Sequence, residues 1–165
     1  MKTAAVIEKM IKFSERNIKD INHFMKVWSF ARLIGILEAL ETEEQEVLEV
    51  AAAVHDIACE FCRKKYGHCS GKVQEEEGPA LTEEFLEEFN FNKEFVERVC
   101  WLVGHHHTYK DVEGKVYQIL LEADFLVNAD EGSAAGEEIR AMHDNVFRTQ
   151  SGKQLLKDMY PEAWQ

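Results

Sequence analysis

The segment EVAAAVHDIA, residues 49–58, is the most informative stretch for the fold. Apolar residues recur at helical spacing from Val47 to Val54, which predicts an amphipathic helix with His55 and Asp56 near its C-terminal end. The three consecutive alanines favour close packing of a neighbouring helix. A histidine and an aspartate are costly to bury unpaired, so the dipeptide predicts either a solvated helix end or a metal site.

The same spacing continues along the chain, and only two prolines interrupt it. Thr42, with Gln45 three residues later, predicts a capping box for the helix that leads to His55. Residues 63–77 lose the periodicity, which predicts a loop, and Gly78-Pro79 predicts the start of the next helix. Further helices are expected at about residues 4–18, 21–40, 93–106, 115–129, 134–147 and 153–159.

These patterns predict an all-α protein of about six to eight helices. We expect one compact domain over residues 1–165, with core motifs in about 20–130 and C-terminal helices in about 134–160. The 31 acidic residues outnumber the 19 basic ones, giving a formal charge of −12. Such a surface disfavours nucleic-acid polymers and membranes as partners. The four cysteines follow no apolar signal segment, so a cytoplasmic location is expected.

Two more residues share the chemistry of the His55-Asp56 pair. His23 falls on the apolar side of its expected helix, where a lone histidine is usually a core residue. Asp124 lies in the apolar run from Ile119 to Val127, where a carboxylate must be paired or bound to a cation. Divalent transition metals bind imidazole and carboxylate together, so these residues are candidate ligands.

The order His23, His55-Asp56, Asp124 resembles the HD-domain metal-dependent phosphohydrolases, over about residues 20–130. In the first motif Lys26 stands where the family usually has arginine. The resemblance implies an HD-type helical domain whose four ligands hold a divalent transition metal (Fe, Mn, Ni, Co or Zn). It implies a hydrolase of a small phosphate ester such as a nucleotide, in which Asp56 both ligates the metal and orients the attacking water. Residues 64–79 resemble an uncharacterised bacterial subgroup.

The resemblance also places a second metal in some members. One ion is expected and two are possible, the second using Glu77, where histidine is commoner, and His105, with Asp56 as the bridge. His106 is a further candidate for metal or substrate, whereas His107 is expected to be exposed. Candidates for binding substrate phosphate are Lys26, Lys64 and Lys72, although each is more often a surface lysine.

Alternative interpretations remain open. Cys59, Cys62, His68 and Cys69 have the composition of a structural zinc site, although ordinary reduced thiols are favoured. The protein could also be a metal-containing ligand-binding or regulatory module without turnover. A di-iron oxygenase is disfavoured by Glu77 in place of histidine. The sequence leaves the substrate, the metal and the oligomeric state open.

Overall fold

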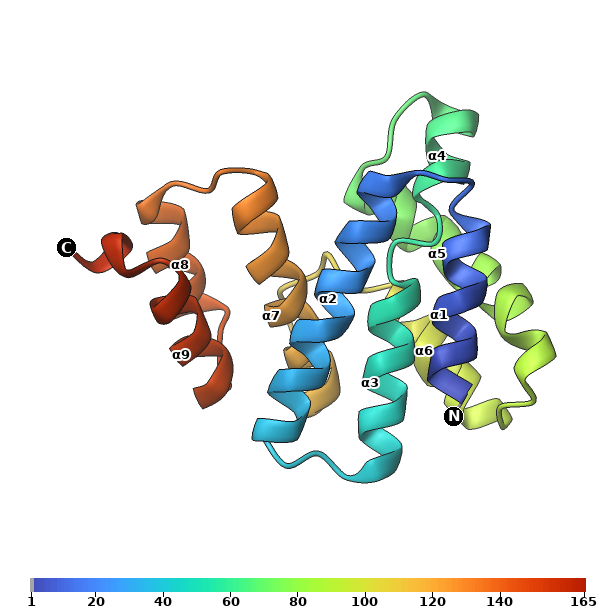
Figure 1. Ribbon diagram of the computed structural model, residues 1–165, viewed down its shortest axis with the longest axis horizontal. Helices are drawn as coiled ribbons and strands as arrows, with labels where there is room; N and C mark the ends of the chain where they lie inside the picture. Colours follow the sequence, from blue (N-terminus) through green and yellow to red (C-terminus); the bar gives the residue numbers. More distant parts are fainter. Residues whose placement is uncertain (1) are drawn as a thin grey trace.

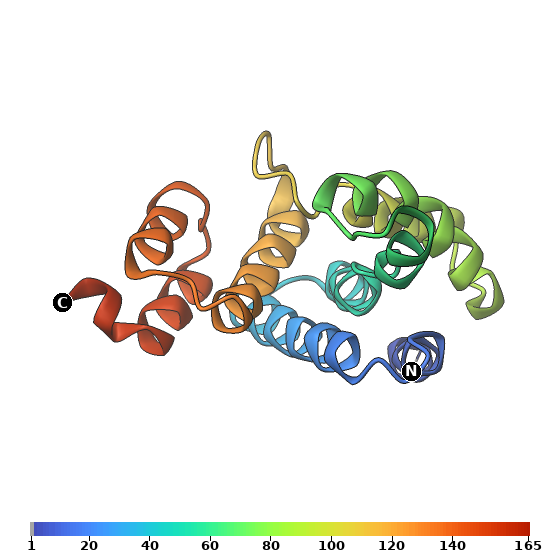
Figure 2. The ribbon, with the colours of Figure 1, turned by 90° about the horizontal axis from the view of Figure 1, so that it is seen from above.

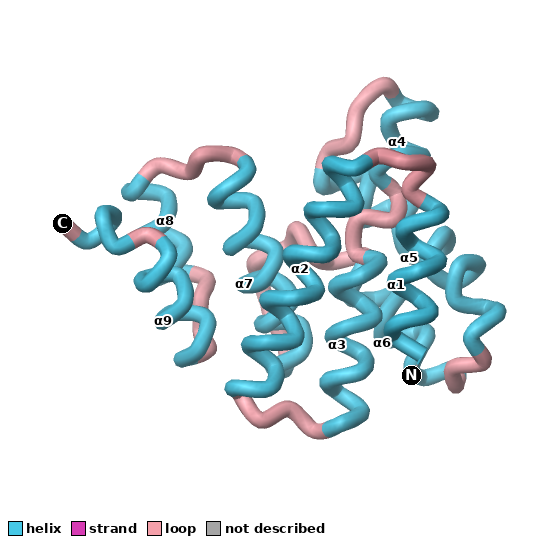
Figure 3. The backbone as a smooth tube through the Cα atoms, in the orientation of Figure 1, coloured by secondary structure: helices cyan, strands magenta, loops and turns pink. Residues whose placement is uncertain are grey.

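The computed structural model describes residues 2–165, which form nine α-helices and two short 3₁₀ helices and contain no strand (Figures 1 and 3). The all-α prediction is therefore confirmed. The extra helix, beyond the six to eight expected, is α4. The elements are α1 (Lys2–Phe13), α2 (Ile18–Leu37), α3 (Thr42–Val54), α4 (Cys59–Tyr66), α5 (Gly71–Leu86), η1 (Glu87–Phe89), α6 (Lys93–Val103), α7 (Gly114–Glu131), α8 (Gly136–Asn145), α9 (Gln150–Met159) and η2 (Pro161–Trp164).

The core is built around α2, α3 and α7, which pack on one another. Helix α7 is buried at every residue from Val116 to Val127, as expected of a helix that is apolar nearly all round. Helices α1 and α6 cover the other side of α3, and α5 packs on α6. The C-terminal helices α8 and α9 lie at the opposite end of the molecule, beyond α7 (Figures 1 and 2). No helix among residues 2–165 is long and apolar enough to cross a membrane.

Two predicted helix boundaries near the N-terminus were wrong. Helix α1 ends at Phe13 rather than near residue 18, because Glu15 and Arg16 take positive φ values of 46° and 68° and form a turn. Helix α2 begins earlier than expected, and its cap is Asn17, whose side chain accepts a hydrogen bond from the Asp20 N–H. Asparagine is a favoured N-cap, and this cap sets where α2 starts.

The capping box at the start of α3 was also wrong. Thr42 is already the first helical residue, and the preceding Glu41 makes no side-chain cap. The Gln45 amide instead donates to the buried Glu49 carboxylate at 2.9 Å. The side chain of Gln45 is therefore used to hold a buried acid rather than to cap the helix.

The loop predicted for residues 63–77 is mostly helical. Helix α4 ends at Tyr66 and is capped by Gly67, whose left-handed φ of 76° suits glycine, and only residues 67–70 connect it to α5. Helix α5 starts at Gly71, so Pro79 lies inside it rather than in its first turn. Packing explains this, because α5 lies so close to α6 that a Cβ on Gly78 would come within 2.6 Å of Val103.

The segment that leads into α9 is hydrogen-bonded to Glu122, a buried carboxylate of α7. Glu122 is fully buried and accepts hydrogen bonds from the Arg148 and Thr149 backbone N–H groups at 2.7 and 3.0 Å and from the Gln118 amide at 2.7 Å. These bonds fix the chain entering α9, which begins three residues earlier than predicted. Glu122 is two residues before Asp124 in the middle of α7.

Candidate metal centre

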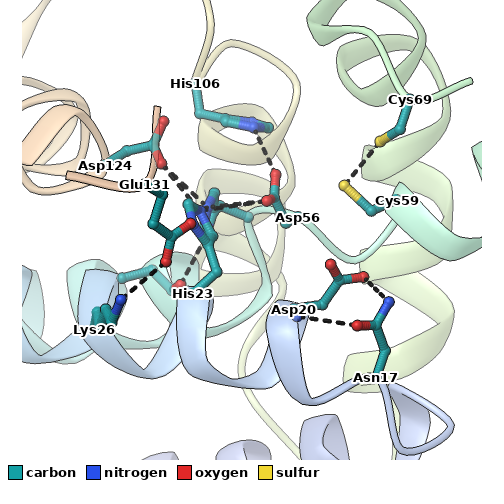
Figure 4. Close-up of polar contacts among 12 residues, drawn as sticks. Asn17, Asp20, His23, Lys26, Asp56, Cys59, Cys69, His106, Asp124 and Glu131 are labelled. Carbon is teal, nitrogen blue, oxygen red and sulfur yellow. Dashed lines mark hydrogen bonds and ion pairs between the residues drawn. The ribbon is translucent and has the colours of Figure 1, made fainter. Parts of the chain in front are cut away.

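Two histidines and two aspartates, from α2, from the turn that follows α3 and from α7, lie close together inside the helical core; Figure 4 labels three of them, His23, Asp56 and Asp124. His23 Nε2 lies 3.2 Å from His55 Nε2, 3.3 Å from Asp124 Oδ1 and 3.5 Å from Asp56 Oδ2. His55 Nε2 lies 3.5 Å from Asp124 Oδ1 and 3.6 Å from Asp56 Oδ2. We call His23, His55, Asp56 and Asp124 the central cluster. The structure thus brings together the four residues that the sequence motifs singled out.

The other nitrogen of each imidazole in the central cluster is already used. His23 Nδ1 donates to the Glu131 carboxylate at 2.9 Å, and His55 Nδ1 donates to the Ala52 carbonyl at 2.8 Å. With these protons on Nδ1, the two neutral rings present lone pairs on Nε2, only 3.2 Å apart. Such an arrangement is repulsive unless a proton or a cation lies between them.

Asp124 strengthens this conclusion. Its side chain is 2% exposed, and with both rings neutral neither of its oxygens accepts a hydrogen bond from residues 2–165. A buried carboxylate without donors is costly, whereas a cation bound between it and the imidazoles would offset that cost. Two imidazoles and two carboxylates are a donor set that suits divalent transition metals. The residues present therefore fit a metal ion.

The electrostatics without metal show how strongly the cluster attracts positive charge. Burial alone would lower the pKa of His23, but Asp124, Asp56 and Glu131 raise it to about 9. Burial would likewise raise the pKa of Asp124, but the neighbouring His23 and His55 hold it well below its usual range. A similar balance, with His55 and His106 as partners, lowers the pKa of Asp56. Without a metal, a proton on His23 therefore offsets part of the negative charge of the two aspartates.

A second group of possible ligands shares Asp56. Its Oδ1 lies 3.4 Å from His106 Nε2, and Asp56, His106 and His107 can each direct one ligand atom to a common point. His106 is fully buried, and its Nδ1 donates to the Val103 carbonyl at 2.7 Å. The Nε2 atoms of His106 and His107 are buried and have no hydrogen-bond partner among residues 2–165. Both imidazoles therefore have a nitrogen free for a ligand.

The structure does not bring Glu77 and His105 to this second group. Glu77 accepts hydrogen bonds from Lys65, at 2.7 Å, and from the Tyr66 hydroxyl, on the side of α5 that faces α4. His105 stacks on Trp101 and donates to its carbonyl at 2.7 Å. Helix α6 ends at Val103, and the turn that follows aims the next histidine inward instead.

The expected exposure of His107 was wrong. This residue is half-buried, and burial lowers its pKa to about 4, assisted by the charge of His106. Its backbone N–H donates to Glu75 of α5 at 3.0 Å, which draws the turn after α6 against α5. The three consecutive histidines therefore point in different directions, and only the last two face Asp56.

The three candidate phosphate-binding lysines lie in different settings. Lys26 is next to the central cluster, because it pairs at 3.1 Å with the Glu131 carboxylate that holds His23 (Figure 4). Lys64 pairs with Glu15 and Glu60, and Lys72 is exposed and pairs with Glu76 at 3.8 Å. Only Lys26 is tied to the cluster through a shared partner.

Glu131 is a residue that the sequence reasoning missed. It lies seven residues after Asp124, two helical turns further along the same face of α7. An acid in the last turn of a helix interacts unfavourably with the helix dipole. The position of Glu131 in the sequence therefore indicates that its carboxylate has a partner elsewhere in the fold. Carboxylates that accept the second N–H of a ligating histidine orient the ring and raise its basicity.

The zinc alternative gains no support from the geometry. Among residues 2–165, the groups of three or more side chains that could hold one ion include none of the cysteines. Cys59 and Cys69 lie together, but Cys62 faces the Val73 carbonyl at 3.7 Å, and His68 lies against Tyr66. The four cysteines are free thiols.

Comparison with known proteins identifies the family. Residues 20–135 match the HD domain, and the chain therefore belongs to the HD-domain family. One similar solved structure is that of a predicted HD superfamily hydrolase from an uncultured Thermotogales bacterium. It has a TM-score of 0.66 and 20% sequence identity, and the match covers 98% of this chain and 85% of that one. No curated protein matches the sequence significantly. The match to the family ends before α8, so the C-terminal helices lie outside it.

Proposed function

We propose that this protein is a metal-dependent phosphohydrolase that acts on a small phosphate ester such as a nucleotide, with a divalent transition metal held by the central cluster. Membership of the HD-domain family supports a metal-dependent hydrolase in general. The observation that carries the proposal is the buried Asp124 carboxylate, which faces two imidazole Nε2 atoms and, while those rings are neutral, has no hydrogen-bond donor among residues 2–165.

A divalent cation bound in such a site polarises a phosphoryl oxygen and lowers the pKa of a water molecule toward neutrality. The chain supplies the orientation. Asp56 is the most exposed member of the central cluster, with 23% of its side chain accessible against 2% for Asp124. Its carboxylate can accept a hydrogen bond from the attacking water and direct the water oxygen at phosphorus. The new P–O bond forms as the ester P–O bond breaks; the attacking water loses a proton to solvent, and the leaving oxygen takes one up from solvent.

Substrate charge must be balanced locally, because the protein as a whole carries a formal charge of −12. Lys26 is suited to this role, since its half-exposed ammonium lies at the edge of the cluster. Its ammonium can donate a hydrogen bond to a phosphate oxygen at this edge. The geometry gives Lys64 and Lys72 no comparable connection to the cluster.

A second ion, if bound, would use Asp56 as a bridge together with His106 and His107. Asp56 directs Oδ2 toward His23 and Oδ1 toward His106. A carboxylate with one oxygen on each side can bind two neighbouring cations. Titration of metal into stripped protein tests this. Two equivalents in wild type that fall to one in the double variant His106→Gln/His107→Gln support a two-metal centre, with Glu77→Gln as a control that keeps two. One equivalent in all three proteins rejects it.

The function is tested by removing metal with a chelator, restoring Mn²⁺, Co²⁺, Ni²⁺ or Fe²⁺, and measuring phosphate release from a panel of nucleotides and simple phosphate monoesters. We expect release that requires metal, is lost in Asp56→Ala and persists in His105→Gln, whose side chain lies outside both groups. Metal binding without release of phosphate from any ester would instead indicate a ligand-binding module. Oxygen consumption by the iron-loaded protein would indicate an oxygenase.

A further inference from the structure

Two cysteines lie in contact beside the central cluster. Cys59 is the first residue of α4, and Cys69 lies in the short connection between α4 and α5. Their sulfur atoms are 2.8 Å apart (Figure 4). The Cys59 backbone N–H donates to the Asp56 carbonyl at 2.9 Å, so the pair is one hydrogen bond away from a residue of the cluster.

The arrangement is close to what a disulfide requires. A disulfide bond is about 2.05 Å long, so the sulfurs need to approach by only about 0.8 Å. Residues 67–70, which carry Cys69, form no helix and begin with the left-handed Gly67, so the connection can adjust more easily than a helix. The other two cysteines are differently placed, because Cys62 faces the Val73 carbonyl and Cys100 lies on α6.

The two thiols differ in the way that thiol–disulfide exchange requires. Cys69 is partly exposed, so an oxidant can reach its sulfur from solvent. Cys59 is buried, with only 6% of its surface exposed. Thiolates are the attacking species in this chemistry. Cys69 is therefore the thiol that meets an oxidant first, and Cys59 is the thiol that resolves the product.

We propose that Cys59 and Cys69 are a redox modification site, which forms a reversible disulfide on reaction with a low-molecular-weight disulfide such as oxidised glutathione. The Cys69 thiolate attacks one glutathione sulfur, forms a mixed disulfide and releases the first glutathione thiolate. Cys59 then attacks the Cys69 sulfur and releases the second. The two cysteines lose two electrons and two protons, and oxidised glutathione gains both as two thiols.

The test uses the reduced full-length protein, incubated with oxidised glutathione, quenched with acid and alkylated. Of the four thiols, two should be lost, and dithiothreitol should restore them. Because Cys59 and Cys62 fall in one tryptic peptide, cleavage after Glu60 is needed as well. The peptide map should then join Cys59 to Cys69. Retention of all four thiols in folded protein would show an inert hydrogen-bonded pair and overturn the proposal, as would a bridge to Cys62 or Cys100.

Variants distinguish the attacking thiol, Cys69, from the resolving thiol, Cys59. Cys59→Ser should stop at a mixed disulfide, retaining one glutathione on Cys69, whereas Cys69→Ser should leave the buried Cys59 reduced. Cys62→Ser and Cys100→Ser are matched controls and should form the wild-type bridge. Circular dichroism checks that each variant is folded. If Cys59→Ser does not fold, the wild-type peptide map and Cys69→Ser still decide the outcome, and glutathione retained on Cys59 in that variant contradicts the assigned order.

Discussion

Replacing Glu131 by alanine should weaken metal binding although this residue is not a member of the central cluster. Its carboxylate accepts the His23 Nδ1 proton at 2.9 Å and pairs with Lys26 at 3.1 Å. Without it, the ring loses the bond that aims Nε2 at the cluster and the charge that raises its basicity. Loss of such an outer partner typically costs about 10–100-fold in metal affinity, or about 1.4–2.7 kcal/mol.

The assay is a competition titration of stripped protein with a chelator of known affinity, using one metal throughout. Asp130→Ala is the matched control, because Asp130 is adjacent, 70% exposed and 3.9 Å from Lys26, and it should change affinity less than about twofold. Glu131→Gln keeps an acceptor without the charge and should fall between wild type and Glu131→Ala. Equal affinities for wild type and Glu131→Ala would show that Glu131 does not orient or activate His23.

Three further predictions follow from the same structure. Asp124→Asn should abolish metal retention through gel filtration, because it removes the buried charge that the cation neutralises; wild-type metal content by elemental analysis would contradict this. Metal affinity should fall about tenfold for each unit by which pH is lowered below about 9, because metal displaces the proton that His23 then carries. Calorimetry in buffers of different ionisation enthalpy should find about one proton released per ion at pH 7. Metal binding that releases no proton would contradict this prediction. Gly78→Ala should lower the free energy of unfolding by about 1–3 kcal/mol, because its Cβ would lie 2.6 Å from Val103, and an unchanged urea midpoint would exclude that clash.

The sequence was sufficient for the central cluster because its members lie in or next to strongly apolar helices. His23 shares a face with Phe24 and Val27 in α2, and Asp124 lies in a helix buried nearly all round, so each had to point inward. A buried polar residue in such a pattern requires a partner, and the packing of α2, α3 and α7 provides it.

The positions of His106 and His107 could not be predicted in the same way, because both residues lie in the turn after α6. Once α6 ends at Val103, helical periodicity no longer says which of three adjacent histidines faces inward, and the answer was displaced by one residue from the expected His105. Glu77 was assigned to the second ion from its place before Gly78-Pro79 in the family pattern, and the residues before it were interpreted as a loop. They are the first turns of α5, in which only Lys72 and Glu76 are exposed, and Gly78 packs closely on Val103 further along the same helix. Tertiary contacts decided both cases.

Whether the central cluster holds a metal can be observed in a crystal structure of the full chain grown with Mn²⁺, with anomalous data collected on either side of the metal edge. We expect an anomalous peak bounded by the side chains of the central cluster, with metal–ligand distances of about 2.0–2.3 Å to His23 and His55 Nε2 and to the two carboxylates. Manganese bound elsewhere, with the central cluster holding only a proton or water, would contradict it.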